Sequence, residues 1–164
     1  MMQVFLGLGS NLGNREQNLA QAIARLAALP DTEVRKRSSI YESKPIGPEQ
    51  PDFLNAAIEI KTSLAPSALL TECKRIEREL GRVDGPRWGP RPLDIDLLLA
   101  DQIVAEPQLQ VPHLELHKRA FALLPMCELA PEAVHPVFGW KLCELLADVA
   151  DQQVCRVGDF YVET

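Results

Sequence analysis

The hydrophobic pattern begins with a short apolar run at residues 3–8, which predicts a buried strand that ends at Gly9. Asn14 is a suitable helix N-cap, and Gln17 at the third helical position completes the sequence pattern of a capping box. Apolar residues then recur at helical spacing until Pro30, which predicts a first helix. These apolar residues are Leu19, Ile23 and Leu26.

Two strands are predicted in succession after this helix. Residues 33–41 are rich in β-branched and aromatic side chains, and a proline-rich loop separates them from residues 53–62. The second of these segments alternates with a period of two, so Phe53 and Asn55 lie on one face of the strand. The opposite, apolar face consists of Leu54, Ala56, Ile58 and Ile60.

A second helix and a fourth strand complete the predicted core. Pro66 opens the helix and Gly81 ends it. Residues 94–100 form the strand, with Asp94 and Asp96 on one face. The apolar positions expected to face the core are Leu69, Cys73, Ile76 and Leu80 on the helix and Ile95, Leu97 and Leu99 on the strand.

The resulting β-α-β-β-α-β order predicts an α+β protein with a ferredoxin-like core, in which both helices cover one face of an antiparallel sheet. The other face would carry Phe53, Asn55, Asp94 and Asp96 together. Extra C-terminal helices, roughly residues 118–128 and 140–149, would pack around this unit. A length of 164 residues fits one domain that spans residues 1–164.

Composition excludes several classes of protein. Hydrophobic residues make up 46% and charged residues 24% of the chain, which is a normal globular balance. A net charge of −6 argues against general binding to nucleic acid or to an anionic membrane. The N-terminus lacks the features of a signal peptide and no apolar run approaches membrane length, so we expect a cytoplasmic protein. We also expect the protein to be a monomer.

The four cysteines form no C-x-x-C pair, which favours buried reduced thiols over a metal site or disulfides. They are Cys73, Cys127, Cys143 and Cys155. Residues 74–91 are locally basic within this acidic chain. On charge alone, a site for a small anionic ligand and a solvated helix face followed by a charged loop are equally good interpretations.

The glycine pattern at residues 7–13 resembles a dinucleotide-binding turn, but such a pattern is weak when it stands alone. A Rossmann unit needs a parallel strand after the first helix, whereas here two strands follow in succession, so we favour glycines that allow a tight turn. The chain also lacks a P-loop motif and the lysine and catalytic-loop pattern of protein kinases.

The pair Asp94 and Asp96 is a candidate Mg²⁺ site, because residues two apart on a strand aim their carboxylates to the same side. Such a D-x-D pair occurs often by chance, and it also serves as a metal site in glycosyltransferases. Here Arg87, Trp88 and Arg91 lead directly into it. Guanidinium groups bind phosphate oxygens, and an indole stacks on a planar heterocycle, so this segment suits a nucleotide.

A third cluster follows at Val111-Pro112-His113, with Arg119 and Phe121 close behind in the sequence. His113 could donate a hydrogen bond to a phosphate, and Arg119 could neutralise its charge. We expect His117 and His135 at the surface.

The stretch RWGPRPLDID at residues 87–96 resembles the signature of the 6-hydroxymethyl-7,8-dihydropterin pyrophosphokinases. Residues 9–13, 53–56 and 111–113 (GSNLG, FLNA and VPH) also match that family, and the agreement in order and spacing extends from about Val4 to Pro136. The resemblance implies a ferredoxin-like core and two Mg²⁺ ions. It also implies transfer of the terminal diphosphate of ATP to the hydroxymethyl oxygen of the pterin, with release of AMP.

By position, the resemblance implies roles for sixteen residues of this chain. Asp94 and Asp96 would bind the metal ions, and Arg82 and Arg91 would act with them in catalysis. Nucleotide contacts would come from Lys74, Glu77, Arg82, Trp88, Arg91, Leu97, His113 and Arg119. The pterin would lie among Ser43, Ile46, Gly47, Phe53, Asn55, Trp88 and Phe121.

This chain departs from the well-known bacterial pattern in three places that bear on nucleotide binding and loop closure. It has Asp84-Gly85 where basic residues are common, Gln108 where an arginine is frequent, and Lys44 where a proline is common. Glycine and proline near Gly47 and Gly85 nevertheless suggest loops that close over bound ATP.

Two other functions rank below the pyrophosphokinase. A non-catalytic domain that senses a metabolite would not need paired Mg²⁺ ligands beside two arginines and a tryptophan. A metal-dependent nucleotide-sugar transferase would need a larger α/β domain than 164 residues comfortably supply.

Overall fold

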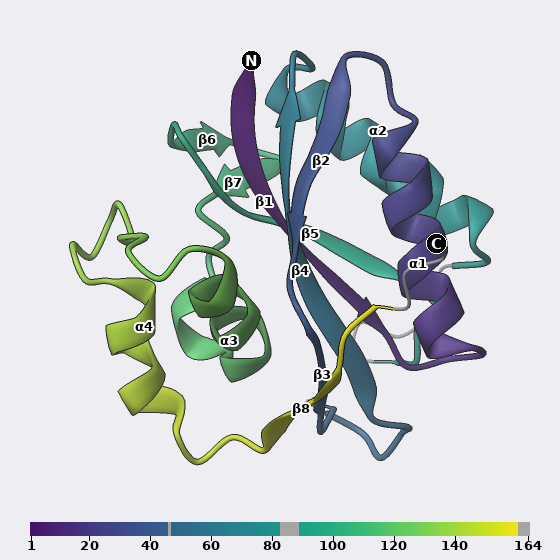
Figure 1. Cartoon of the computed structure of the whole chain (residues 1–164), viewed down its shortest axis with the longest axis vertical. Coiled ribbons are helices and arrows are strands. Elements are labelled where there is room, and N and C mark those ends of the chain that lie inside the picture. Colours follow the sequence, from purple (N-terminus) through teal and green to yellow (C-terminus); the bar gives the residue numbers. More distant parts are fainter. Residues whose placement is uncertain (46, 83–88, 161–164) are drawn as a thin grey trace.

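The computed structural model describes residues 1–45, 47–82 and 89–160. Its main sheet is antiparallel with the strand order β5-β1-β4-β3-β8, and β2 also pairs with β4 (Figure 1). A separate two-stranded sheet consists of β6 and β7. The elements are β1 (Met2–Ser10), α1 (Arg15–Ala27), β2 (Thr32–Arg37), β3 (Ile40–Ser43), β4 (Phe53–Thr62), α2 (Pro66–Glu79), β5 (Asp94–Ala100), β6 (Val104–Glu106), β7 (Leu109–Val111), the 3-10 helix η1 (Leu116–Lys118), α3 (Ala120–Leu129), α4 (Leu142–Leu145), the 3-10 helix η2 (Leu146–Val149) and β8 (Val154–Gly158).

The two core helices begin where the sequence predicts, α2 ends just before Gly81, and α1 ends at Ala27, three residues before Pro30. Asn14 caps α1 by accepting a hydrogen bond from the backbone N–H of Gln17 at 3.1 Å. Pro66 occupies the first turn of α2, where its missing N–H costs nothing. Gly81 follows α2 with a φ of +100°, a conformation that glycine adopts without strain.

Each face of the sheet carries its own apolar cluster. Helices α1 and α2 cover one face, and the predicted apolar side of β4 lies against them. Helix α3 covers part of the other face, where Phe5, Ala57, Leu98, Leu123 and Met126 are buried together. The part of this second face that α3 leaves uncovered holds the candidate site described below.

The predicted orientation of Leu99 is wrong. Phe5 of β1 pairs with Leu99 and Leu6 pairs with Leu97, so Leu98 is an extra residue in β5. This bulge reverses the alternation, and Leu99 joins the cluster under α3 instead of the cluster under α1 and α2. Leu98 packs over Gly7, where an added Cβ would approach its Cδ1 to 3.0 Å.

The strand predicted at residues 33–41 is in fact two strands, β2 and β3. Ser38 lies between the two strands. Its N–H donates to the Ala57 carbonyl at 2.9 Å, and its hydroxyl oxygen accepts from the Ala57 N–H at 2.9 Å. The hydroxyl thereby replaces a backbone acceptor at this position. The helix predicted at residues 140–149 is likewise shorter, starts at Leu142 and continues as 3-10 helix.

Three expectations about polar side chains need correction. His135 is buried rather than at the surface, since its Nδ1 accepts hydrogen bonds from the N–H groups of Val137 and Phe138 and its ring stacks on Phe138. His117 is half-buried and contacts the same phenyl ring edge-on. All four cysteines are free, but Cys73 is the only buried one.

The sequence did not predict β8. This strand pairs with β3, and Phe160 beyond it enters the core under α1 and α2. Among the described residues, no helix has the length and apolar character needed to cross a membrane.

Candidate functional site

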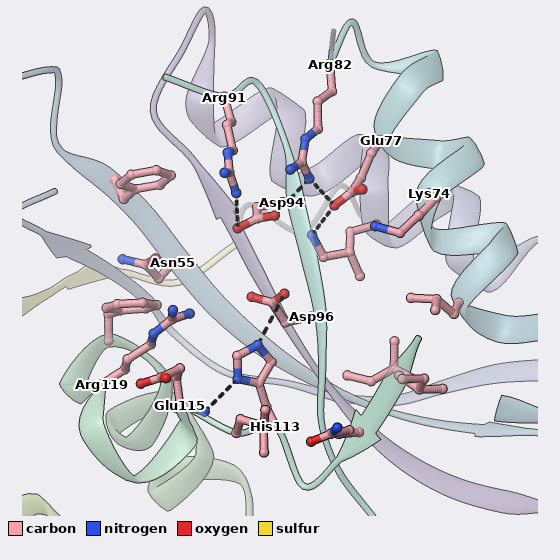
Figure 2. Close-up of a pocket in the computed structure, with 18 of the residues that line it drawn as sticks. Asn55, Lys74, Glu77, Arg82, Arg91, Asp94, Asp96, His113, Glu115 and Arg119 are labelled. Carbon is pink, nitrogen blue, oxygen red and sulfur yellow. Dashed lines mark hydrogen bonds and ion pairs between the residues drawn. The ribbon is translucent and has the colours of Figure 1, made fainter. Parts of the chain in front are cut away.

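A cleft of about 540 Å³ opens between α2, β5, the β6-β7 hairpin and the start of α3 (Figure 2). It brings together most of the residues named from the sequence. Gly47 does not line the cleft, and Ile46 and Trp88 lie outside the described residues. The predicted residues that line it are Ser43, Phe53, Asn55, Lys74, Glu77, Arg82, Arg91, Asp94, Asp96, Leu97, His113, Arg119 and Phe121.

Asp94 and Asp96 project into this cleft from β5, as the period of a strand requires (Figure 2). Arg82 donates to one oxygen of Asp94 at 3.0 Å, and Arg91 donates to the other oxygen at 3.4 Å. The Asp94 carboxylate therefore bridges two guanidinium groups, and both arginines lie between α2 and β5. These groups are fixed charges at any physiological pH.

Glu77 anchors this arrangement from α2. Its Oε2 accepts the backbone N–H of Ile95 at 2.8 Å and the Arg82 guanidinium at 2.8 Å. Burial raises its pKa, whereas the Ile95 N–H and Arg82 oppose that rise. A carboxylate that the sequence places on a charged helix is thus a buried support that joins α2, β5 and Arg82.

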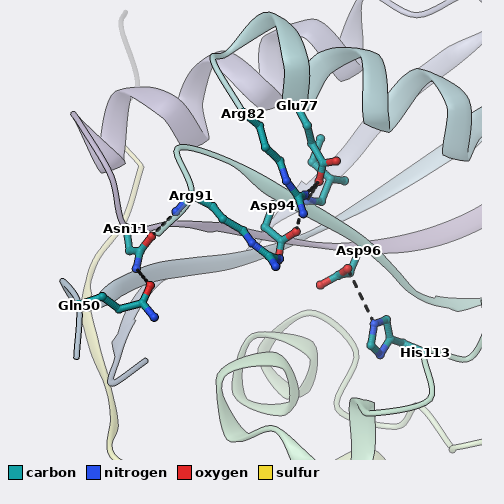
Figure 3. A network of polar contacts seen from close by, with 9 residues as sticks. Asn11, Gln50, Glu77, Arg82, Arg91, Asp94, Asp96 and His113 are labelled. Carbon is teal, nitrogen blue, oxygen red and sulfur yellow. Dashed lines mark hydrogen bonds and ion pairs between the residues drawn. The ribbon is translucent and has the colours of Figure 1, made fainter. Parts of the chain in front are cut away.

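His113 faces Asp96 across the cleft, with its Nε2 3.8 Å from Asp96 Oδ1 (Figures 2 and 3). Its Nδ1 accepts a hydrogen bond from the backbone N–H of Glu115 at 3.1 Å, so a neutral ring carries its proton on Nε2. Burial and the nearby Arg119 lower the pKa of His113. The ring therefore presents a neutral N–H donor to the cleft near neutral pH.

Asp96 is in an unfavourable environment for a bare carboxylate. Burial and the neighbouring Asp94 raise its pKa to about 7, although Arg119 opposes this shift. Two converging carboxylates form an electronegative site, and a bound cation would offset the repulsion between their charges.

The opposite end of the cleft is mainly uncharged and is called the neutral end below, although the Arg119 guanidinium lies over the Phe121 ring, 5.6 Å from its centroid. Asn55 donates from Nδ2 to the hydroxyl oxygen of Ser43 at 2.7 Å, and both residues are buried. Phe53 and Phe121 add aromatic surface.

Asn11 lies between Gln50 and Arg91 beside the cleft, and the sequence analysis gave it no role of its own (Figure 3). Its Oδ1 accepts the backbone N–H of Arg91 at 2.7 Å, and its own N–H donates to the Arg91 carbonyl at 3.0 Å. Its Nδ2 donates to Gln50 Oε1 at 2.8 Å and to the Pro51 carbonyl at 3.0 Å. With 1% of its surface exposed, Asn11 joins the proline-rich loop to the loop that carries Arg91.

Several cleft residues were missed as site residues. Lys44 and Gln108 line the cleft, although they were noticed only as departures from a pattern. Glu115 and Leu114 also line it, and their position directly after the Val-Pro-His motif was the available signal. The other residues contributed by the β6-β7 hairpin carried no signal, because only the fold brings this hairpin beside β5.

Known proteins match this chain along most of its length. Residues 5–131 match the family described as 7,8-dihydro-6-hydroxymethylpterin-pyrophosphokinase. The chain is 44% identical over 159 residues to the 2-amino-4-hydroxy-6-hydroxymethyldihydropteridine pyrophosphokinase of Aquifex aeolicus, covering 96% of this chain and 98% of that protein. It is 47% identical over 130 residues to the pyrophosphokinase of the same name from Bacillus subtilis, covering 78% of each.

The solved structures agree on the fold. The wild-type HPPK-DHPS of Plasmodium falciparum, with pterin and p-hydroxybenzoate, superposes with a TM-score of 0.71 at 15% identity. The match covers 92% of this chain and 43% of that one, so the chain spans less than half of that protein.

Proposed function

This chain belongs to the 7,8-dihydro-6-hydroxymethylpterin-pyrophosphokinase family, and we propose that it transfers diphosphate from ATP to 6-hydroxymethyl-7,8-dihydropterin, a step of folate biosynthesis. Its relatives are named as pyrophosphokinases, that is, as enzymes that transfer diphosphate. The chain is accordingly an enzyme of this class. Its substrates, its metal ions and the roles of its residues belong to the proposal.

One observation carries the proposal: a single cleft has a charged end that suits a polyphosphate and a neutral end that suits a flat heterocycle. Asp94, Asp96, Arg82 and Arg91 lie at the charged end. The neutral end offers aromatic surface and the Ser43–Asn55 pair. Diphosphate transfer between a nucleotide and a pterin requires both environments side by side.

The residues present fit Mg²⁺. The ion prefers carboxylate oxygens and completes its octahedron with water and substrate phosphates, so two aspartates suffice on the protein side. No group of three or more His, Cys, Asp or Glu side chains suited to a metal occurs among the described residues. Asp94 and Asp96 would hold two Mg²⁺ ions together with ATP. The two ions would neutralise charge at the phosphates and assist loss of the hydroxyl proton.

In the proposed reaction the hydroxymethyl oxygen bonds to the β-phosphorus of ATP while the bond from that phosphorus to the α–β bridging oxygen breaks. AMP leaves with the bridging oxygen, and the hydroxyl proton is lost. Arg82 and Arg91 would exchange their contacts with Asp94 for phosphate oxygens, and Arg119 would add charge from the start of α3. His113 would donate from Nε2 to a phosphate oxygen.

At the neutral end, Phe53 and Phe121 would sandwich the pterin ring, and Asn55 would hydrogen-bond to its polar edge. Ser43 would hold the Asn55 amide in place. On α2, Lys74 and Glu77 would border the nucleotide, with Leu97 of β5 beside them.

The order β5-β1-β4, with β2 and β3 on the far side of β4, supports the further proposal that the core is ferredoxin-like. The bulge in β5 and the added β8 are elaborations of that core.

The test is formation of AMP from ATP by the purified protein with Mg²⁺, measured with and without 6-hydroxymethyl-7,8-dihydropterin. We expect AMP that depends on the pterin, equimolar pterin diphosphate and no ADP. ADP in place of AMP would overturn diphosphate transfer. Binding of pterin or ATP without any AMP would instead favour a non-catalytic binding domain.

A further inference from the structure

The strand β3 ends at Ser43, the residue that holds the Asn55 amide at the neutral end of the cleft. It is only four residues long and has β4 on one side and β8 on the other. Ser43 pairs with Phe53 of β4 and with Val154 of β8. Without β8, this short strand would be an edge strand, and short edge strands are weakly held.

The C-terminal segment, residues 153–160, extends this support beyond β3. The Lys44 N–H donates to the Gln153 carbonyl at 3.4 Å, so pairing continues to the first residue of the proline-rich loop. At its other end, Phe160 is 9% exposed and packs into the core under α1 and α2. The segment thus contacts the protein along its whole described length.

A cluster of polar side chains fixes this segment at the start of β3. Ser39 is 4% exposed, and its N–H donates to Glu128 of α3 at 2.9 Å. Its hydroxyl lies 2.8 Å from Asp159 Oδ1 and accepts from Arg156 Nε at 2.9 Å. Arg156 also pairs with Asp159 at 2.9 Å, so residues of β3, α3 and the C-terminal segment meet at one serine.

Tyr41 adds a second contact to this cluster. Its hydroxyl donates to Glu128 Oε1 at 2.7 Å. Burial and this hydrogen bond raise the pKa of Tyr41, which keeps the hydroxyl protonated as a donor at physiological pH. None of these side chains lines the cleft, so any effect on catalysis must act through the position of β3.

We propose that the C-terminal segment, residues 153–160, is a positioning element for pterin binding: through Arg156 and Asp159 it holds β3 so that Ser43 orients Asn55. This inference rests on the proposed function. It assigns no chemistry to the segment, and it predicts an effect on one substrate alone. The charged groups proposed to bind ATP lie on α2 and β5, between these two elements (Arg82 and Arg91) and at the N-cap of α3 (Arg119), whereas β8 pairs with β3.

The test is the double variant R156A/D159A, compared with E33A/R35A. The control removes an exposed Glu–Arg pair with a 3.2 Å contact from β2, a strand of the same sheet that does not line the cleft. Loss of the net contribution of about one hydrogen bond should raise the KM for the pterin roughly three- to ten-fold. The KM for ATP and kcat should stay at wild-type values, and the control should match wild type throughout.

A second readout does not depend on activity. Hydrogen exchange of the Asn55 side-chain amide, followed by NMR in the unliganded protein, should accelerate in R156A/D159A and not in E33A/R35A. An unchanged pterin KM together with unchanged Asn55 exchange would overturn the inference. If the wild-type protein forms no AMP, the proposed function fails, and the exchange measurement still decides whether the segment positions Asn55.

Discussion

The two ends of the cleft are ordered by different forces. At the charged end, Arg82, Arg91 and Asp94 hold one another by ion pairs that involve the groups that would bind substrate. At the neutral end, Asn55 is held by Ser43, and the pairing of β3, β4 and β8 holds both. Under the proposed function, the charged end would exchange its partners on binding ATP and metal, whereas the Ser43–Asn55 contact at the neutral end is already formed.

This difference predicts different kinetic signatures. Groups whose charge is used at the reacting phosphates stabilise the transition state more than the bound substrate, so changing them lowers kcat. Groups that only orient the pterin contribute to binding in both states, so changing them raises the pterin KM. The following variants test this division, starting with the largest expected effect.

Replacing either aspartate by asparagine should abolish most activity. We expect D94N and D96N each to lower the rate of AMP formation about a thousand-fold or more at saturating Mg²⁺, because each variant loses a carboxylate proposed to hold the metal. The exposed Asp101 directly follows the same strand and accepts a hydrogen bond from the Gln3 N–H, so it provides the control D101N. Near-wild-type turnover in D94N or D96N would contradict the metal assignment.

D96N should also be more stable than wild type under metal-free conditions. The folded protein raises the pKa of Asp96 to about 7, above the usual carboxyl value near 4, so wild-type stability falls as the pH rises between these values. Asparagine does not ionise and removes this loss. Thermal unfolding in EDTA at pH 8 should therefore give a higher Tm for D96N than for wild type. A lower Tm would show that the ionised Asp96 carboxylate does not destabilise the folded protein.

Asn11 joins the proline-rich loop to the loop that carries Arg91, so its replacement should affect kcat and both KM values. In N11D the carboxylate still accepts the Arg91 N–H, but it cannot donate to the Pro51 carbonyl. The Pro51 carbonyl would then be left without this donor, at a free-energy cost of about 1–3 kcal/mol. If the two loops shift by this amount of free energy, kcat/KM should fall on the order of ten- to a hundred-fold. Steady-state kinetics with each substrate varied in turn would measure it.

The control for N11D is N14D, which adds the same charge three residues away. Asp replaces Asn well as a helix N-cap, so N14D should retain wild-type kinetics. A loss confined to the pterin KM in N11D would contradict a role for Asn11 at the charged end.

Much of this architecture is predictable because it depends on local signals. The period of two in β4 and β5 places Phe53, Asn55, Asp94 and Asp96 on one face, and the structure confirms it. The helix starts marked by Asn14 and Pro66 are equally local. These features need no knowledge of which segments meet in space.

The remaining features depend on contacts that are distant in the sequence. The bulge at Leu98 exists only in relation to β1, and the interruption at Ser38 depends on its hydrogen bonds to Ala57. Glu77 looks like a solvated helix residue until Ile95 and Arg82 are placed beside it. The pairing of β8 with β3 follows from no pattern in either strand, since each is short and irregular.

Ser43 should give the smallest effect and the clearest separation between the two ends. In S43A the Asn55 amide loses its acceptor, and the pterin KM should rise by up to about ten-fold with little change in kcat or in the KM for ATP. T62V is the matched control, because Thr62 is a buried hydroxyl at the other end of β4 that hydrogen-bonds to Thr32 at 2.7 Å. Both variants should lose stability, but T62V should keep its pterin KM. If S43A instead lowered kcat as strongly as it raised the pterin KM, Ser43 would act in the transition state, and the neutral end would not be a binding surface alone.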